Sequence, residues 1–273
     1  MSVDAKNLAG PIIRVENLVT HYGDTPILKG VSFCVDPGEI FVIIGGSGCG
    51  KTTLLKHMTG LLSPTSGKIV HDGTDITLLD EDELTRVQRN IGIAFQSGGL
   101  FNSMTVGDNV ALPLREYGKV GEDLIPSLVR FKLNLVGLGA AEHLMPDELS
   151  GGMKKRAGLA RAIALDPPVI YFDEPSAGLD PIMASGLDDL ILNLRRLLGI
   201  TFIIVTHELD SIRKISDRIL MLDQGSAIFL GTLAEAESSD APRVRQFFER
   251  RADEFIAQRG MVPGGHEEEE GAE

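Results

Sequence analysis

The sequence has few features of secreted, membrane-spanning or disulfide-stabilised proteins. Its two cysteines, Cys34 and Cys49, are too few for a disulfide framework or a cysteine metal site. No apolar run approaches the roughly 18 residues that cross a bilayer, and the first ten residues lack the charged and apolar regions of a signal peptide. We therefore expect reduced thiols and a cytoplasmic location.

The sequence also has no excess of basic residues. It contains 26 Lys and Arg and 39 Asp and Glu, which gives a formal net charge of -13. A general nucleic-acid binder needs a basic face, so we expect no nucleic-acid partner. Part of the acidity lies in the final HEEEEGAE, and we expect residues 261–273 to be an acidic, disordered tail.

Alternating and apolar segments indicate the fold class. The early segments IIRVENLVTHYG and ILKGVSFCVD predict antiparallel strands, whereas the near-continuous apolar runs in EIFVIIG, PVIYFDEP and TFIIVTHE predict strands buried on both faces. Helical patterns alternate with these runs. The prediction is therefore an α/β fold with a mainly parallel sheet covered on both sides and the early antiparallel strands at its edge.

Two other regions are predicted to be largely helical. From about residue 98 to 165, helical spacing is interrupted by Pro and Gly, which indicates an inserted helical subdomain. After a terminal hairpin in RILMLDQGSAIFLGT, residues 233–260 have the spacing of an amphipathic extension. Its apolar stripe consists of Val244, Phe247, Phe248, Ala252, Phe255 and Ile256. The stripe could pack on its own domain or dock on another subunit.

The segment GGSGCGKT matches the phosphate-loop pattern G-x-x-x-x-G-K-[ST] in full, between a buried strand and a helix. Glycines let successive N–H groups turn inward around a phosphate, and the helix N-terminus adds partial positive charge. Lys51 is expected to reach the terminal phosphates and Thr52 to ligate magnesium. The candidate ATP-binding residues here are Gly45, Gly46, Ser47, Gly48, Cys49, Gly50, Lys51, Thr52 and Thr53. A thiol reagent on Cys49 is expected to block ATP binding, and ATP to protect this thiol.

A second motif, VIYFDEP, places two carboxylates at the end of a buried strand. Asp173 could hold magnesium through water, and Glu174 could orient or deprotonate an attacking water. This favours a hydrolase over a kinase, since the acceptor would be water. The absence of an N-K-x-D sequence weakens the alternative of a GTPase.

The third motif is LSGG, about twenty residues before the Asp-Glu strand. A Ser and two Gly that open a helix form another anion-binding N-terminus. Together the three motifs resemble the ATP-binding cassette (ABC) family, with LSGG as its signature. The resemblance implies a P-loop NTPase (RecA-like) core with an N-terminal antiparallel β subdomain. It also implies a head-to-tail dimer in which Ser150, Gly151 and Gly152 of one copy close on the ATP and Mg²⁺ of the other.

Further positions match the family in order. The resemblance implies that Tyr22 stacks on adenine, that Gln96 contacts magnesium and the attacking water, and that His207 contacts the terminal phosphate. It also implies that SAGLD, residues 176–180, crosses between subunits. The resemblance covers residues 12–232. Met153 departs from it, because the wider family commonly has Gln there, but we expect the chemistry to survive.

Several local strings, such as FQSGGLFNSMTVGDNVALPLRE, resemble the Mla-type subgroup, which moves phospholipids between bacterial membranes. The resemblance implies two copies of this chain with two MlaE-like permeases, a lipid-binding MCE-type (MlaD-like) protein and, in some members, a small MlaB-like regulator. It also implies peripheral attachment to the cytoplasmic face of the inner membrane. Leu100, Phe101 and Met104 could contact a permease helix or belong to the core.

Two alternatives share the catalytic motifs. One is an ABC ATPase for another cargo, such as amino acids or lipoproteins. The other is a soluble ABC ATPase of iron-sulfur assembly or translation. The single cassette and acidic balance argue against the translation factors, which usually carry two cassettes and a basic linker.

Overall fold

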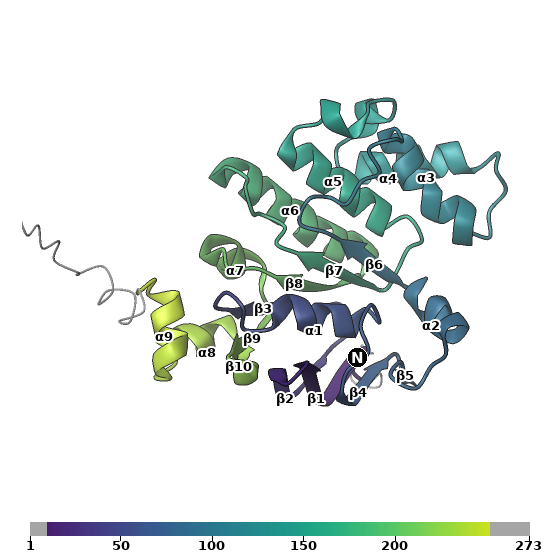
Figure 1. Ribbon diagram of the computed structural model, residues 1–273. Coiled ribbons are helices and arrows are strands. Elements are labelled where there is room, and N and C mark those ends of the chain that lie inside the picture. The colour runs from purple at the N-terminus through teal and green to yellow at the C-terminus, as the bar shows by residue number, and fades with distance from the viewer. Residues whose placement is uncertain (1–9, 252–273) are drawn as a thin grey trace, which may run out of the picture.

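The computed structural model describes residues 10–251, and Figure 1 shows their arrangement. The strands are β1 (Ile13–Tyr22), β2 (Thr25–Val35), β3 (Ile40–Gly45), β4 (Ser66–His71), β5 (Thr74–Asp75), β6 (Ile91–Ala94), β7 (Val169–Asp173), β8 (Thr201–Val205), β9 (Arg218–Asp223) and β10 (Ser226–Thr232). The helices are α1 (Lys51–Met58), α2 (Glu81–Gln88), α3 (Val106–Tyr117), α4 (Ile125–Leu135), α5 (Gly151–Ala162), α6 (Pro181–Leu198), α7 (Leu209–Ile215), α8 (Leu233–Glu237) and α9 (Pro242–Phe248).

A six-stranded sheet in the order β10-β9-β3-β8-β7-β6 forms the centre of the molecule. Its strands are parallel except β10, which pairs antiparallel with β9 as the predicted hairpin. The three predicted buried strands are β3, β7 and β8. In β3, Phe41 and Ile43 join the core on one face, while Val42 and Ile44 join the core on the other. Burial on both faces therefore explains the continuous apolar run.

The early strands do not lie at the edge of this sheet, so that detail of the prediction is wrong. They form a second, four-stranded antiparallel sheet in the order β2-β1-β4-β5. Its apolar residues share a core with α1 and one face of the central sheet, and Figure 1 shows α1 between the two sheets. As a separate sheet, these strands can bury their apolar face against a neighbouring layer. Pairing at the edge of the central sheet would leave that face exposed.

Helices α3, α4 and α5 lie together on the side of the central sheet away from the second sheet (Figure 1). The loop that leads into them is held by Asn109, a fully buried residue of α3. Its side-chain amide accepts from the Phe101 N–H at 2.7 Å and donates to the carbonyls of Phe101, Met104 and Thr105. Within residues 10–251, no helix is long and apolar enough to cross a bilayer.

The described part of the C-terminal extension contains two short helices. Residues 233–251 form two short helices, α8 and α9, and Val244 and Phe248 of α9 are buried in the chain's own core. Helix α9 ends at Phe248, and the backbone takes a left-handed conformation at Arg250, with φ of +55°. Ala252, Phe255 and Ile256 of the predicted stripe, and the acidic tail, lie outside the described residues.

Candidate nucleotide site

Four neighbouring parallel strands carry the predicted catalytic motifs to one edge of the central sheet. The phosphate loop follows β3, His207 follows β8, Asp173 ends β7 and Gln96 follows β6. The pairings β3 with β8, β8 with β7 and β7 with β6 are all in parallel register. Since parallel strands end at the same edge, groups from four distant parts of the sequence face one region.

The phosphate loop requires glycine for both backbone angle and space. Gly45 and Gly50 have φ of +147° and +105°, values that residues with a Cβ rarely adopt. A Cβ at Gly45 would lie 2.2 Å from the Leu222 carbonyl oxygen, and one at Gly50 would lie 2.8 Å from Leu28 Cδ2. Helix α1 begins directly afterwards at Lys51, so its free N–H groups point toward the loop.

Lys51 folds back across the mouth of the loop. Its Nζ donates to the carbonyl oxygens of Gly45 and Gly46, both at 2.9 Å. Bound phosphate oxygens would replace these neutral acceptors with charged ones, which form stronger hydrogen bonds. Thr52, in the first turn of α1, is exposed at the same place.

Cys49 lies inside the loop but is 5% exposed. Burial raises the pKa of the Cys49 thiol, and the Lys51 charge opposes this only in part. The thiolate is the reactive form of cysteine, so a raised pKa slows modification at neutral pH. The expected attack by thiol reagents should therefore be slow.

We expect Cys49 to be alkylated slowly by iodoacetamide at pH 7, with a rate that reaches its plateau at a higher pH than that of an ordinary thiol, because its pKa is raised. ATP should slow the reaction further. Mass spectrometry of a Cys34→Ser variant, which leaves Cys49 as the single thiol, measures the rate. Rapid alkylation at pH 7 that ATP does not affect would place Cys49 away from the nucleotide.

Asp173 and Glu174 form a crowded acidic pair at the end of β7. Burial, and secondly the charge of Glu174, raise the pKa of the Asp173 carboxyl, while the charges of Lys51, Lys56 and Lys155 lower it. Glu174 Oε1 accepts a hydrogen bond from His207 Nδ1 at 2.9 Å. In the described part of the chain, the buried Oε2 of Glu174 has no hydrogen-bond partner. An unpaired carboxylate oxygen at this edge can accept a proton from a bound water.

The residues present fit a magnesium ion held largely by a nucleotide. Residues 10–251 contain no cluster of three or more His, Cys, Asp or Glu side chains that could hold a metal by themselves. Mg²⁺ typically takes one or two protein ligands together with phosphates and waters. The partly buried Asp173 carboxylate, whose pKa burial raises, and the exposed Thr52 hydroxyl offer such ligands.

The LSGG motif lies at the start of α5, where Ser150 is the N-cap and its Oγ accepts from the Met153 N–H at 3.3 Å. Gly151 is exposed and Gly152 is buried, and a Cβ at Gly152 would lie 2.6 Å from Met183 Cε. In Figure 1, α5 belongs to the upper helical group and α1 lies below the central sheet. The two anion-binding helix starts therefore belong to different parts of one chain.

The other predicted residues occupy separate positions around the site. Tyr22 ends β1 on the second sheet and is 51% exposed, as a ring that receives a base must be. Gln96 is exposed on the loop between β6 and α3. Ser176 is buried and bonds to Ser211, whereas Asp180 caps α6. Two features escaped sequence reasoning: the His207–Glu174 hydrogen bond and a buried lysine on α5, treated below.

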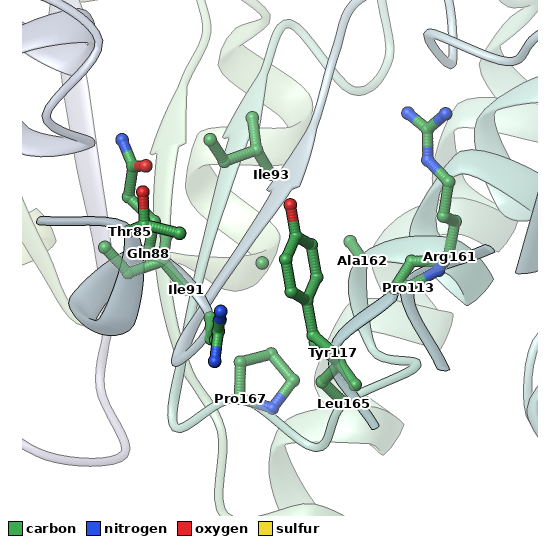
Figure 2. A pocket seen from close by; sticks show the side chains of 12 residues that line it. Thr85, Gln88, Ile91, Ile93, Pro113, Tyr117, Arg161, Ala162, Leu165 and Pro167 are labelled. Atoms are coloured by element: carbon green, nitrogen blue, oxygen red, sulfur yellow. The ribbon is translucent and has the colours of Figure 1, made fainter. Parts of the chain in front are cut away.

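A cleft of about 230 Å³ lies between the central sheet and the helical group. It is lined by side chains of α2, β6, α3 and α5, and Figure 2 shows the Tyr117 ring standing in its middle. The Arg89 guanidinium lies 4.9 Å from the centre of this ring. Phe95, Phe101 and Tyr117, which surround the cleft or the loop beside it, are each more than 40% exposed. Leu100 instead packs against the core.

Comparisons with known proteins agree with this geometry. The family model for ABC transporters matches residues 28–177. Among curated proteins, the probable ribonucleotide transport ATP-binding protein mkl of Mycobacterium leprae is 42% identical over 248 residues, which covers 91% of this chain and 72% of mkl. The intermembrane phospholipid transport system ATP-binding protein MlaF of Haemophilus influenzae is 44% identical over 242 residues, covering 89% of this chain and 92% of MlaF.

A solved structure adds the assembled state of a similar cassette. The dimeric post-hydrolysis structure of the ATP-binding cassette MJ0796, bound to ADP and phosphate, is 31% identical with a TM-score of 0.75. The match covers 81% of this chain and 98% of that one.

Proposed function

This chain belongs to the ABC transporter family, and from that premise we propose that it is the ATP-hydrolysing subunit of a bacterial phospholipid transporter and works as a head-to-tail dimer. The observation that supports phospholipid as the cargo is the 44% identity to MlaF over 92% of MlaF's length. Hydrolysis of ATP to ADP and phosphate is the activity of the family.

The separation of the two anion-binding helix starts supports the head-to-tail dimer. The phosphate loop and the LSGG start of α5 lie in different parts of the chain, so one copy does not close both on one nucleotide. In a head-to-tail pair, Ser150, Gly151 and Gly152 of each copy meet the phosphates held by the other. The exposed Gly151 leaves room for this approach.

We assign the chemical step to groups at the sheet edge. Glu174 orients water and accepts its proton through the unpaired Oε2, while His207 holds Oε1. Lys51 and the loop N–H groups stabilise charge on the transferred phosphoryl group. Tyr22 supports the adenine. Thr52, Asp173 and Gln96 would hold Mg²⁺, which supplies charge stabilisation on the phosphates.

A permease subunit is the partner that receives the motion. The cleft beside the Gln96 loop suits a helix of that permease, because Tyr117 in the cleft and the exposed Phe101 on the loop before α3 offer apolar anchors. Asn109 holds the Phe101 backbone, so movement of the loop can be passed to the partner. Helix docking by exposed aromatic anchors is a common recognition mode.

We expect Phe101→Ala to lower lipid transport by about tenfold in the reconstituted complex while ATP hydrolysis stays near the parent rate. The reason is that Phe101 is 49% exposed and outside the catalytic edge, so its loss removes a partner contact. Lipid transfer and ATP turnover are measured on the same proteoliposomes.

Phe131→Ala is the matched control, because Phe131 is similarly exposed on α4. It should leave both rates unchanged. If Phe101→Ala lowers hydrolysis and transport equally, the side chain serves the fold and not the partner.

The remaining partners follow from the MlaF likeness. We propose MlaE-like permeases, an MCE-type MlaD-like lipid-binding protein and an MlaB-like regulator as partners, with the complex at the inner membrane and this chain on its cytoplasmic face. The division into a cassette at 12–232 with a helical subdomain at 98–165, an extension at 233–260 and a tail at 261–273 is part of the same proposal.

A second cargo must be tested, because mkl is named for ribonucleotide transport and is 42% identical to this chain. We favour phospholipid, since the chain matches 92% of MlaF but 72% of mkl. The test reconstitutes the chain with its permease and measures ATP-dependent movement of a fluorescent phospholipid and of a radiolabelled ribonucleotide. Movement of the nucleotide alone would refute the lipid assignment.

A further inference from the structure

Lys155 is a buried cation that the proposed chemistry does not use. It lies on α5, and its residue is 5% exposed. Its Nζ donates a hydrogen bond of 2.8 Å to the main-chain carbonyl oxygen of Glu174. Burial lowers the pKa of Lys155, and the charges of Glu174 and Asp173 oppose that effect. A lysine is seldom buried without a specific partner, and here the partner is the backbone of the proposed base.

The backbone that Lys155 contacts is strained. Glu174 has φ of +47°, a conformation that costs energy for any residue with a Cβ. Three hydrogen bonds hold it there: the Glu174 N–H donates to the Val205 carbonyl at 2.8 Å, and the Glu174 carbonyl accepts from the Lys155 ammonium and, at 3.3 Å, from the Ala177 N–H. The first contact comes from the central sheet and the second from α5. The direction of the Glu174 side chain therefore depends on where α5 lies.

The same helix begins with the LSGG motif. Lys155 follows Ser150 by five residues, about 7.5 Å along the helix axis at 1.5 Å per residue. Arg156, the next residue, donates to the carbonyls of Val136 and Gly186 and so ties α5 to the neighbouring helices. A displacement of the helix start is therefore passed to Lys155 as a rigid movement.

We propose that Lys155 is a positioning residue that couples the two nucleotide sites: when the LSGG end of α5 closes on the partner's ATP, Lys155 sets the Glu174 backbone of its own chain for attack. This inference rests on the proposed head-to-tail function. Through the Lys155 contact, each copy's base responds to nucleotide in the other copy's phosphate loop, which is a coupling between two binding sites.

The test is steady-state ATP hydrolysis by the full chain with Lys155→Met, which keeps the volume and removes the donor. We expect kcat to fall by roughly 10- to 100-fold with an unchanged KM, because a displaced base slows chemistry without weakening binding. The Hill coefficient for ATP should fall to about 1. Lys155→Arg should retain most of the parental kcat and of the parental Hill coefficient, since it keeps a charged donor.

Lys154→Met is the matched control: it makes the same change one residue earlier, on a partly exposed side chain, and should leave all values unchanged. Thermal melting and ATP binding identify a variant that fails to fold, in which case Lys155→Ala, which also removes the donor, carries the test. Parental kcat in Lys155→Met, or a lower kcat with a parental Hill coefficient, would overturn the coupling. If the parent hydrolyses ATP and Glu174→Gln does not, either result leaves the proposed function standing; an inactive parent would overturn both.

Discussion

Glu174→Gln is expected to reduce ATP hydrolysis by roughly 10²- to 10⁴-fold while ATP binding stays near the parent affinity. The amide keeps the size of the side chain but cannot accept a proton from water. The change also alters the carboxylate whose buried Oε2 has no hydrogen-bond partner among residues 10–251. Phosphate release measures the rate, and a fluorescent ATP analogue measures the binding.

Glu208→Gln is the control for this variant. Glu208 is the second carboxylate beside His207, and its Oε1 lies 3.6 Å from His207 Nε2. Its side chain is more exposed than that of Glu174. Its loss should leave turnover within about twofold of the parent, as is usual for exposed charges. Near-parental hydrolysis by Glu174→Gln would show that another group activates water.

Lys51→Ala is expected to weaken ATP binding by about 100-fold, since a charged hydrogen bond to a phosphate contributes roughly 1.5–3 kcal/mol. Lys51 already lies across the loop, with its ammonium bonded to the Gly45 and Gly46 carbonyls. Its removal takes away both the phosphate contact and a contact that shapes the empty loop. Isothermal titration with ATP and magnesium measures the effect.

Lys56→Ala, on the same helix, provides the comparison for Lys51→Ala. The Lys56 side chain is exposed and forms no part of the loop. The Lys56→Ala variant should bind ATP with parental affinity and melt at the parental temperature. Equal loss of affinity in both variants would mean that the overall positive charge of α1 binds the nucleotide and that Lys51 makes no specific contact with it.

Much of the site could be predicted because its residues follow buried strands. The runs before Gly45, Asp173 and His207 are continuous in apolar residues, and such runs fit parallel strands that end at one edge. Periodicity and composition therefore located the elements, and the motifs at their ends located the chemistry. The order β3-β8-β7-β6 brings these ends side by side.

The contacts between distant elements could not be predicted in the same way. The Lys155 hydrogen bond joins residues 19 apart in sequence, and the His207–Glu174 bond joins residues 33 apart. Both depend on how helices and loops pack after the strands have formed. The second sheet likewise forms because its apolar face packs against α1 and the central sheet, and no local sequence pattern predicts that contact.

The central claim is that two copies of this chain complete each ATP site. The most direct test is the mass of the Glu174→Gln chain, measured by sedimentation equilibrium with and without ATP and magnesium. We predict a monomer without ATP and, with ATP, a dimer that holds one nucleotide per chain and that Gly151→Asp abolishes. A Glu174→Gln chain that binds ATP fully yet remains a monomer at every concentration would contradict the account.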